Sequence, residues 1–554
     1  MPASLAACLF FSFILWLFYR NSRSAPGISG GLWIPLIWVG IMESKPVAYW
    51  FMSAQDSGDV EMYLDGNPMD RNILLLLIFA GVWVLMRRPL DWGAIFRDNR
   101  WLWILYLYLA ISVLWSDFPF VAFKRWFKDF GNLVMILIIV TERDPIEALR
   151  AVFVRCAYVL VPLSVLLIKW YPDIGRYYHP WTYGTLYCGV TTNKNSLGVL
   201  AMLSGLFLLW SLVEIQNLRG SRDYVGWIRR NSWREVPALA KIATMLPEGL
   251  LLFMCVWILT IAHSSTAFGC FLLGTAALFA YRLNWAKAKI RRLSWYTYCL
   301  LVFSALVLFV PDLRKIAAES MGRDATLTTR TYIWEAVLKM PTDMLFGNGF
   351  ASVWLTDIGS ALAKELKIPH AHNGYLEMYL NTGLIGVGLL LIVIVSAGGN
   401  ATRHLARGTP AGPLYMALFL CAVIHNFTEA SFNNNNIIGF CLILVATRYW
   451  RPAWSEAGDA ADAADPSENI RQPLQPAVTL LGPNAFPGRV VVGSQLAMPL
   501  KNKPGVRVVS SRCISQNPSF AMHFKFPAAQ CGPPSPQEQK HAHACASASE
   551  PAPR

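Results

Sequence analysis

The sequence predicts an all-helical membrane protein, a polytopic bundle of about 12 or 13 spans. Of its 554 residues, 55% are hydrophobic and only 15% are charged, which is too little charge to cover the surface of a soluble protein of this size. The apolar residues also come in blocks long enough to cross a hydrocarbon core of about 30 Å, such as 151–169 and 196–215. A core helix of a soluble domain explains one such block but not a series of them.

The apolar blocks define a membrane domain over residues 1–449. Several blocks are shorter than about 20 residues, so we expect tilted helices or interfacial ends. The predicted spans are 4–19, 29–42, 72–86, 101–115, 129–141, 151–169, 196–215, 248–262, 266–281, 296–311, 375–397, 413–428 and 436–449.

Charges in the connecting loops predict the orientation. Basic loops stay in the cytoplasm, so the loops that alternate with them face outward. This places the N-terminus outside, where no basic region precedes the first apolar block, and that block is expected to remain as a span rather than be cleaved. The net charge of +14 reflects this loop bias, and it gives no reason to expect nucleic-acid binding. The basic loops are 20–23, 87–100, 218–234, 282–292 and 403–407, and the outward loops are 43–70, 116–128, 170–195 and 312–374.

Residues 450–554 differ in composition from the rest of the chain. They are rich in Pro, Ala, Ser and Gln and are expected to form a disordered cytoplasmic tail. The Cys and His residues between Cys531 and Cys545 fit no common zinc spacing, so no metal site is predicted there. Only Cys188 lies in an outward loop, and no periplasmic disulfide is therefore expected.

The outward loop 312–374 is the richest in chemistry. Residues 331–340 predict a helix that Pro341 ends, with one apolar face formed by Ile333, Trp334, Val337 and Leu338. The FGNG run at 346–349 predicts a tight turn, because glycine accepts left-handed backbone angles. Arg323 and Arg330 precede the helix. Either they face lipid phosphates from a helix on the membrane surface, or they form a guanidinium clamp on a diphosphate.

The end of this loop holds two histidines. His370 and His372 precede Asn373 and the start of a helix that enters the membrane. The partial positive charge of a helix N-terminus disfavours protonated histidine, so His372 is expected to be neutral and usable as a base near pH 7. The alternative is a polar cap on a membrane helix. His370 follows Pro369, and its side chain is expected to point elsewhere.

Two other outward loops carry cations at the membrane boundary. Lys194 lies between two asparagines in TTNKNSLG, and Lys124 and Arg125 lie among aromatic residues in WSDFPFVAFKRW. The loop at 116–128 predicts an interfacial helix. These cations either anchor the chain at the interface or bind an anionic lipid head group.

Five motifs together resemble the O-antigen ligase and polymerase superfamily, and within it the exopolysaccharide polymerases of the rhizobial type. The resemblance runs from about Trp115 to Tyr449, and the superfamily pattern of His, ten residues, then Gly is met by His372 and Gly383. Thr329 stands where the subgroup usually has Gly before its arginine. The motifs are WSDFPFVAFKRW, TTNKNSLG, GRDATLTTRTYIW, FGNGFASVW and HAHNGYLEMYLNTG.

The resemblance implies a helical membrane bundle with a large periplasmic loop in the bacterial inner membrane. It implies an enzyme that moves a glycan from undecaprenyl diphosphate to an acceptor hydroxyl, without a cofactor or metal, most simply as a repeat-unit polymerase. An O-antigen ligase acting on lipid A-core is the alternative within this class, and a chain-length regulator or export proteins are possible partners. A transporter or flippase of lipid-linked glycans, or a non-catalytic assembly partner, are the other classes. Transporters usually place charge at the membrane midplane, whereas here the charges collect in loops.

Carried onto this sequence, the resemblance gives His372 and Arg330 catalytic roles. His372 accepts the proton of the acceptor hydroxyl, with His370 as the competing base, and a single displacement inverts the anomeric centre. Arg330 neutralises the departing diphosphate. The residues expected to assist in substrate binding are Lys194, Lys124, Arg125, Arg323, His370 and Asn373.

Overall fold

The computed structural model describes residues 1–24, 29–51, 67–178, 184–217, 238–281, 330–366, 370–432 and 436–449, with isolated positions between 283 and 302. The predicted tail, 450–554, and Arg323 lie outside these residues. The helices are α1 (Ala3–Ser24), α2 (Trp33–Met42), α4 (Pro68–Met86), α5 (Trp92–Asp98), α6 (Arg100–Ile111), α7 (Pro119–Val140), α8 (Pro145–Trp170), α9 (Pro172–Gly175), α10 (Lys194–Asn217), α11 (Ala238–Ala262), α12 (Ser265–Ala280), α16 (Arg330–Leu338), α17 (Asp357–Leu366), α18 (Gly374–Ala406), α19 (Gly412–His425) and α20 (Ile437–Ala446).

The helical membrane fold is confirmed. Among the described residues, six helices are long and apolar enough to cross a membrane, and five shorter apolar helices accompany them. Each predicted span overlaps a helix, apart from 296–311, most of which lies outside the described residues. The six are Ala3–Asn21, Pro68–Met86, Pro145–Trp170, Lys194–Glu214, Met245–Ala262 and Gly374–Ala406.

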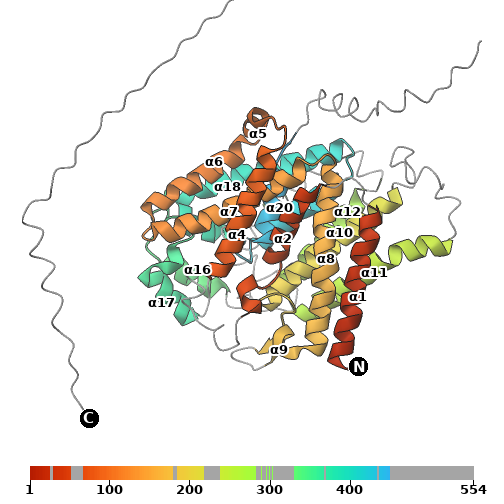
Figure 1. The fold of residues 1–554 in the computed structure, drawn as a ribbon. Coiled ribbons are helices and arrows are strands. Elements are labelled where there is room, and N and C mark those ends of the chain that lie inside the picture. The colour runs from red at the N-terminus through yellow and green to blue at the C-terminus, as the bar shows by residue number, and fades with distance from the viewer. Residues whose placement is uncertain are drawn as a thin grey trace, which may run out of the picture. The chain divides into compact units, whose positions relative to one another are not determined.

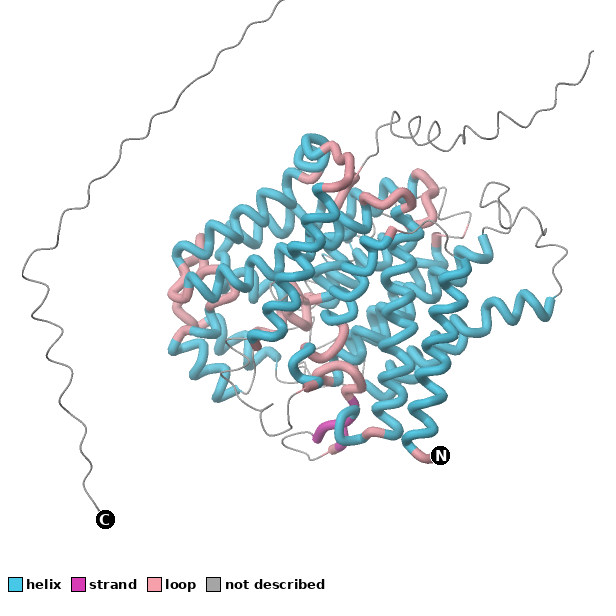
Figure 2. The backbone as a smooth tube through the Cα atoms, in the orientation of Figure 1, coloured by secondary structure: helices cyan, strands magenta, loops and turns pink. Residues whose placement is uncertain are grey.

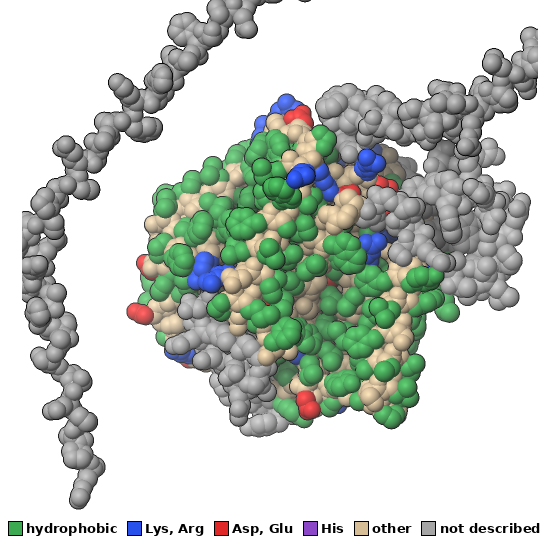
Figure 3. All heavy atoms as spheres, in the orientation of Figure 1, with side chains coloured by type: hydrophobic (Ala, Val, Ile, Leu, Met, Phe, Trp, Pro, Cys, Tyr) green, Lys and Arg blue, Asp and Glu red, His purple; other side chains and the backbone are tan. Residues whose placement is uncertain are grey.

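The helices pack side by side into one bundle (Figure 1). α10 packs against α8, α11 and α12, while α18 packs against α6, α19 and α20. Buried apolar side chains from these helices form a continuous core that includes Trp38, Phe207 and Phe419. Hydrophobic side chains also cover most of the face seen in Figure 3, as expected of a surface in contact with lipid.

Two details differ from the sequence prediction. Residues 116–128 do not form a separate interfacial helix, because from Pro119 they are the first turns of α7, which runs on to Val140. The chain also forms a small antiparallel hairpin in the predicted loop 170–195, from β1 (Arg176–Tyr178) and β2 (Thr185–Tyr187), drawn in magenta in Figure 2.

The segment from α16 to the start of α18 has a small core of its own. α16 begins at Arg330 and presents Ile333, Trp334 and Val337 to this core. The prediction that Leu338 shares their face was wrong, since its side chain is 60% exposed. The other members of the core are Met340, Val353, Trp354, Ala371 and Leu380.

The FGNG turn packs against a break in α18. Gly383 interrupts the helix with φ +62° and ψ −167°, and Gly347 and Gly349 also have positive φ, as the predicted turn requires. The freed N–H of Leu384 donates to the carbonyl of Met344 at 2.9 Å, and Asn348 N–H donates to Leu380 O at 2.9 Å. The loop backbone thus takes the place of the missing helical hydrogen bonds.

Candidate active site

His372 is held where the loop turns into α18. Asn373 caps the helix, with its side-chain oxygen accepting from Tyr375 N–H at 3.0 Å and Leu376 N–H at 3.1 Å. Gly374 N–H donates to the Asn426 carbonyl at 2.8 Å, which fixes this turn against the end of α19. His372 itself has φ +49°, a conformation that non-glycine residues keep only when their surroundings impose it.

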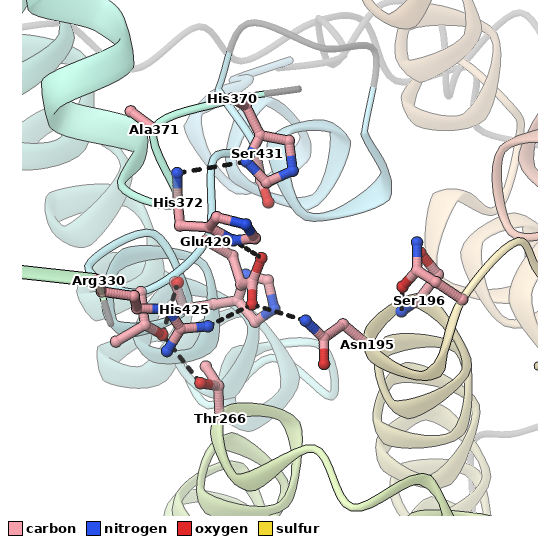
Figure 4. Close-up of polar contacts among 12 residues, drawn as sticks. Asn195, Ser196, Thr266, Arg330, His370, Ala371, His372, His425, Glu429 and Ser431 are labelled. Atoms are coloured by element: carbon pink, nitrogen blue, oxygen red, sulfur yellow. Dashed lines mark hydrogen bonds and ion pairs between the residues drawn. The ribbon is translucent and has the colours of Figure 1, made fainter. Parts of the chain in front are cut away.

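Glu429, in the turn between α19 and α20, gathers donors from three distant parts of the chain (Figure 4). Its Oε1 accepts from Arg330 Nη2 at 2.7 Å and from Asn195 Nδ2 at 3.0 Å. Its Oε2 lies 3.2 Å from His372 Nδ1. The carboxylate therefore joins the start of α16, the start of α10 and the histidine before α18.

The loop core orients the histidines. Trp334 Nε1 donates to the Ala371 carbonyl at 3.0 Å, and Ala371 N–H donates to the buried Glu377 at 2.9 Å. Glu377 also accepts from Trp354 Nε1 at 2.7 Å. The residue between the two histidines is thus fixed on both sides of its backbone.

The expectation that the His370 side chain points elsewhere was wrong. The His370 and His372 rings lie edge to face with their centroids 4.2 Å apart, and His372 N–H donates to His370 Nδ1 at 3.3 Å. The fixed position of Ala371 brings both side chains to the same side of the turn. Burial, with the neighbouring His372 and Arg330, lowers the pKa of His370 to about 4.

The charges in this cluster keep Glu429 ionised. Burial alone would raise the pKa of Glu429, but the hydrogen bond from His372, the charge of His372 when it is protonated and the charge of Arg330 outweigh it and lower the pKa to about 2. An ionised carboxylate only accepts hydrogen bonds, so in the neutral form of His372 the ring hydrogen lies on Nδ1, facing Glu429. Nε2 then has a free lone pair and can accept a proton. The side chains of His372 and Arg330 are 22% and 18% exposed, so a substrate can reach them.

His370, His372 and Glu429 also lie close enough together to hold a metal ion, since one ligand atom from each falls within 4.8 Å of the others. The same Glu429 carboxylate, however, already accepts from Arg330 and Asn195. A divalent cation there would stand beside a guanidinium, and the like charges repel. The geometry therefore fits a hydrogen-bonded His–Glu–Arg cluster better than a metal centre.

The structure brings only some of the predicted residues into this cluster. Lys194 begins α10, and its backbone N–H donates to the Tyr177 hydroxyl at 3.2 Å. Arg125 lies in α7 and donates to the carbonyl of Ala351, while Lys124 stacks over the Phe120 ring at 5.0 Å. Their observed contacts lie outside the Glu429 cluster.

Asn373 is buried at the N-terminus of α18. It is 1% exposed, and its side-chain oxygen is occupied by the cap. The contacts of its side-chain oxygen cap the start of α18, directly after His372.

Three residues of the cluster escaped the sequence prediction. Glu429 and Asn195 supply the central carboxylate and one of its donors, and the buried His425 lies at the end of α19 beside them (Figure 4). A signal for Glu429 was present, because it is an acidic residue between the predicted spans 413–428 and 436–449, on the side that the alternation of loops places outward. Asn195 lies in the TTNKNSLG motif, but the prediction there named only its charged neighbour Lys194.

The comparisons with known proteins agree with the family resemblance that the motifs indicated. A family model described as O-antigen ligase matches residues 250–391, a stretch that includes Arg330, His372 and Gly383. The chain is also 25% identical over 343 residues to the exopolysaccharide production protein ExoQ of Rhizobium meliloti (strain 1021). That alignment covers 58% of this chain and 70% of the relative. The resemblance to the O-antigen ligase and polymerase superfamily, of the rhizobial type, is confirmed.

Proposed function

We propose that this chain, a membrane protein of the O-antigen ligase and polymerase type, is a glycosyltransferase that joins repeat units of an exopolysaccharide or O-antigen. The donor is a glycan on undecaprenyl diphosphate, and the acceptor is a hydroxyl of a second lipid-linked repeat. The reaction takes place at the periplasmic face of the bacterial inner membrane, where the loop 312–374 is predicted to lie.

The observation that best supports the proposal is the convergence of His372 and Arg330 on one buried carboxylate. A glycosyl transfer from a diphosphate donor needs a base for the attacking hydroxyl and a positive charge for the leaving group. Glu429 holds both side chains on one scaffold, so that the two functions are present at the same site.

The reaction follows as a single displacement. His372 Nε2 takes the proton of the acceptor hydroxyl as its oxygen attacks the anomeric carbon. The bond from that carbon to the diphosphate breaks on the opposite face, its electrons go to the diphosphate oxygen, and the configuration inverts. Arg330 stabilises the developing charge of the diphosphate, and Lys194 is proposed to assist from the start of α10. A base with a pKa near 4, as at His370, is poorly matched to this step at pH 7.

The proposal includes independence from metal ions, because Arg330 already supplies positive charge at Glu429. Activity of the purified protein should survive extensive chelation with EDTA. Loss of activity on chelation, restored by one divalent ion, would assign His370, His372 and Glu429 to a metal centre instead.

A deletion strain separates the candidate functions. Accumulation of single lipid-linked repeats indicates a polymerase, and accumulation of full-length lipid-linked chains indicates a ligase. Purified protein in liposomes distinguishes an enzyme from a transporter, since only an enzyme lengthens a lipid-linked repeat. Movement of the substrate across the bilayer without any lengthening would contradict the proposal.

A further inference from the structure

A basic hollow lies at the opposite end of α18 from His372. It has a volume of about 1170 Å³, and its walls come from α5, the start of α6, the second half of α18 and the residues that follow α20. On α18 its first lining residue, Leu391, follows Asn373 by 18 residues and lies beyond the break at Gly383, and the lining includes none of the residues around Glu429. The hollow and the active site are therefore distinct. Its ionisable side chains are Arg97, Asp98, Arg100, Arg403, His404, Arg407 and Arg448.

The lining changes from apolar to basic along one face of α18. Leu391, Ile392 and Val395 line the hollow and are 48%, 37% and 60% exposed. Arg403, about two turns beyond Val395, and Arg407, at the C-cap of α18, line it in their place. This segment lies in and at the end of a candidate membrane span, so the apolar part falls at the depth of acyl chains and the arginines at the depth of head groups. Trp101, 38% exposed, adds an aromatic side chain of the kind enriched at that boundary.

Arg448 is fixed facing this hollow by several hydrogen bonds. Its backbone N–H donates to Asn99 Oδ1 at 2.6 Å and its Nη2 donates to Ser396 Oγ at 2.9 Å. Its buried Nε has no hydrogen-bond partner among the described residues. Arg403 and Arg448 both line the hollow, so their like charges repel each other there. A bound anion would relieve that repulsion.

We propose that this hollow binds the phosphate head group of an anionic membrane lipid, with the arginines on the phosphate and an acyl chain along Leu391, Ile392 and Val395. Five arginines stand against one aspartate in the lining, and guanidinium groups recognise phosphate with paired, charge-assisted hydrogen bonds. The bias of basic residues toward one side of a membrane explains their sign but not their convergence around a hollow. Basic pockets between membrane helices are known to bind acidic lipid head groups. The apolar wall favours a lipid over a free phosphate.

The test is lipid binding by the full-length protein in mild detergent, measured by native mass spectrometry. The probes are phosphatidylglycerol, phosphatidylcholine and inorganic phosphate. Wild-type protein should retain one phosphatidylglycerol in preference to phosphatidylcholine, and inorganic phosphate should displace little of it. The double variant Arg403→Gln/Arg448→Gln should bind phosphatidylglycerol about tenfold more weakly, as expected for the loss of charge-assisted hydrogen bonds.

A charge-matched control is Arg87→Gln/Arg143→Gln, which removes two arginines that do not line the hollow. It should bind as the wild type does. If the double glutamine variant does not fold, Arg403→Lys/Arg448→Lys keeps the charge and should bind with intermediate affinity. Equal retention in all variants, or equal binding of phosphatidylcholine, would overturn the proposal. The proposal would also be overturned if the protein retained lipid only after the acidic residues between 456 and 468 were replaced by neutral ones. That result would indicate that these acidic residues, and not a lipid, occupy the hollow.

Discussion

Replacing Glu429 by glutamine tests whether the carboxylate acts through His372. The change keeps the size of the side chain but leaves one acceptor oxygen where there were two. The amide oxygen should stay with Arg330, because an amide N–H facing a guanidinium would place donor against donor. The amide nitrogen then faces His372 Nδ1, which lies 3.2 Å from Oε2 in the native site.

The size of the effect follows from the tautomer. A donor opposite Nδ1 makes that nitrogen the acceptor, and the ring hydrogen moves to Nε2. Nε2 can then no longer take a proton from the acceptor hydroxyl. The loss should equal the contribution of a general base, about 10²- to 10⁴-fold in the rate of transfer. The opposite amide orientation would remove the acceptor for the hydrogen bond from Arg330 and would also lower the rate, by roughly tenfold or more.

The assay is elongation of a lipid-linked repeat by purified protein at matched concentration, with kcat and KM measured separately. Glu335→Gln is the control, since Glu335 is an exposed carboxylate on α16 of the same loop. Glu429→Gln combined with His372→Ala should be no slower than His372→Ala alone, because the two residues act as one unit. Full additivity of the two losses, or a wild-type kcat in Glu429→Gln, would refute the reasoning.

Four other outcomes are expected. His372→Ala should reduce transfer by about 10²- to 10⁴-fold whereas His370→Ala keeps most of it, and the reverse result in complementation of a null strain would reassign the base. Arg330→Lys should lower kcat, and Arg330→Ala should lower it further with membrane insertion unchanged, because an ammonium cannot contact diphosphate through two parallel hydrogen bonds. Gly383→Ala should release the loop to limited proteolysis, since a Cβ there meets the Leu345 carbonyl carbon and oxygen at 2.2 Å, whereas Gly388→Ala, with open space around it, should have no such effect. The free energy of unfolding should fall as the pH drops from 6.5 toward 4, because His370 takes up a proton more readily in the unfolded chain than in the folded one. His370 should account for at most about 3 kcal/mol of this loss. The unfolding temperature of His370→Gln should therefore depend less on pH over that range.

The helical spans could be predicted from the sequence because each is a local property. An apolar block long enough to cross a bilayer forms a helix wherever it occurs, since lipid offers no other partner for its backbone. The helix start after Asn373 and the tight turn at 346–349 were equally local predictions, and the structure has both features.

The contacts of Glu429 could not be predicted in this way. Its three donors lie 57, 99 and 234 residues away along the chain, and only tertiary packing brings them together. Nothing in the sequence near Lys194 shows that its neighbour Asn195 reaches the carboxylate. The sequence prediction also placed the start of α7 in a separate interfacial helix. In the structure this charged start belongs to α7, and Arg125 donates to the carbonyl of Ala351, a contact that only tertiary packing creates.

The break at Gly383 gives a physical meaning to the ten residues that separate it from His372. Those residues wind nearly three helical turns between the point where the FGNG loop docks and the imidazole. One residue more or fewer would turn His372 about 100° around the helix axis and shift it about 1.5 Å along that axis relative to the docked loop. α16 of the same loop begins with Arg330, so the spacing also influences how Arg330 and His372 face each other. The geometry therefore constrains the number of these ten residues, all of which are buried or half-buried.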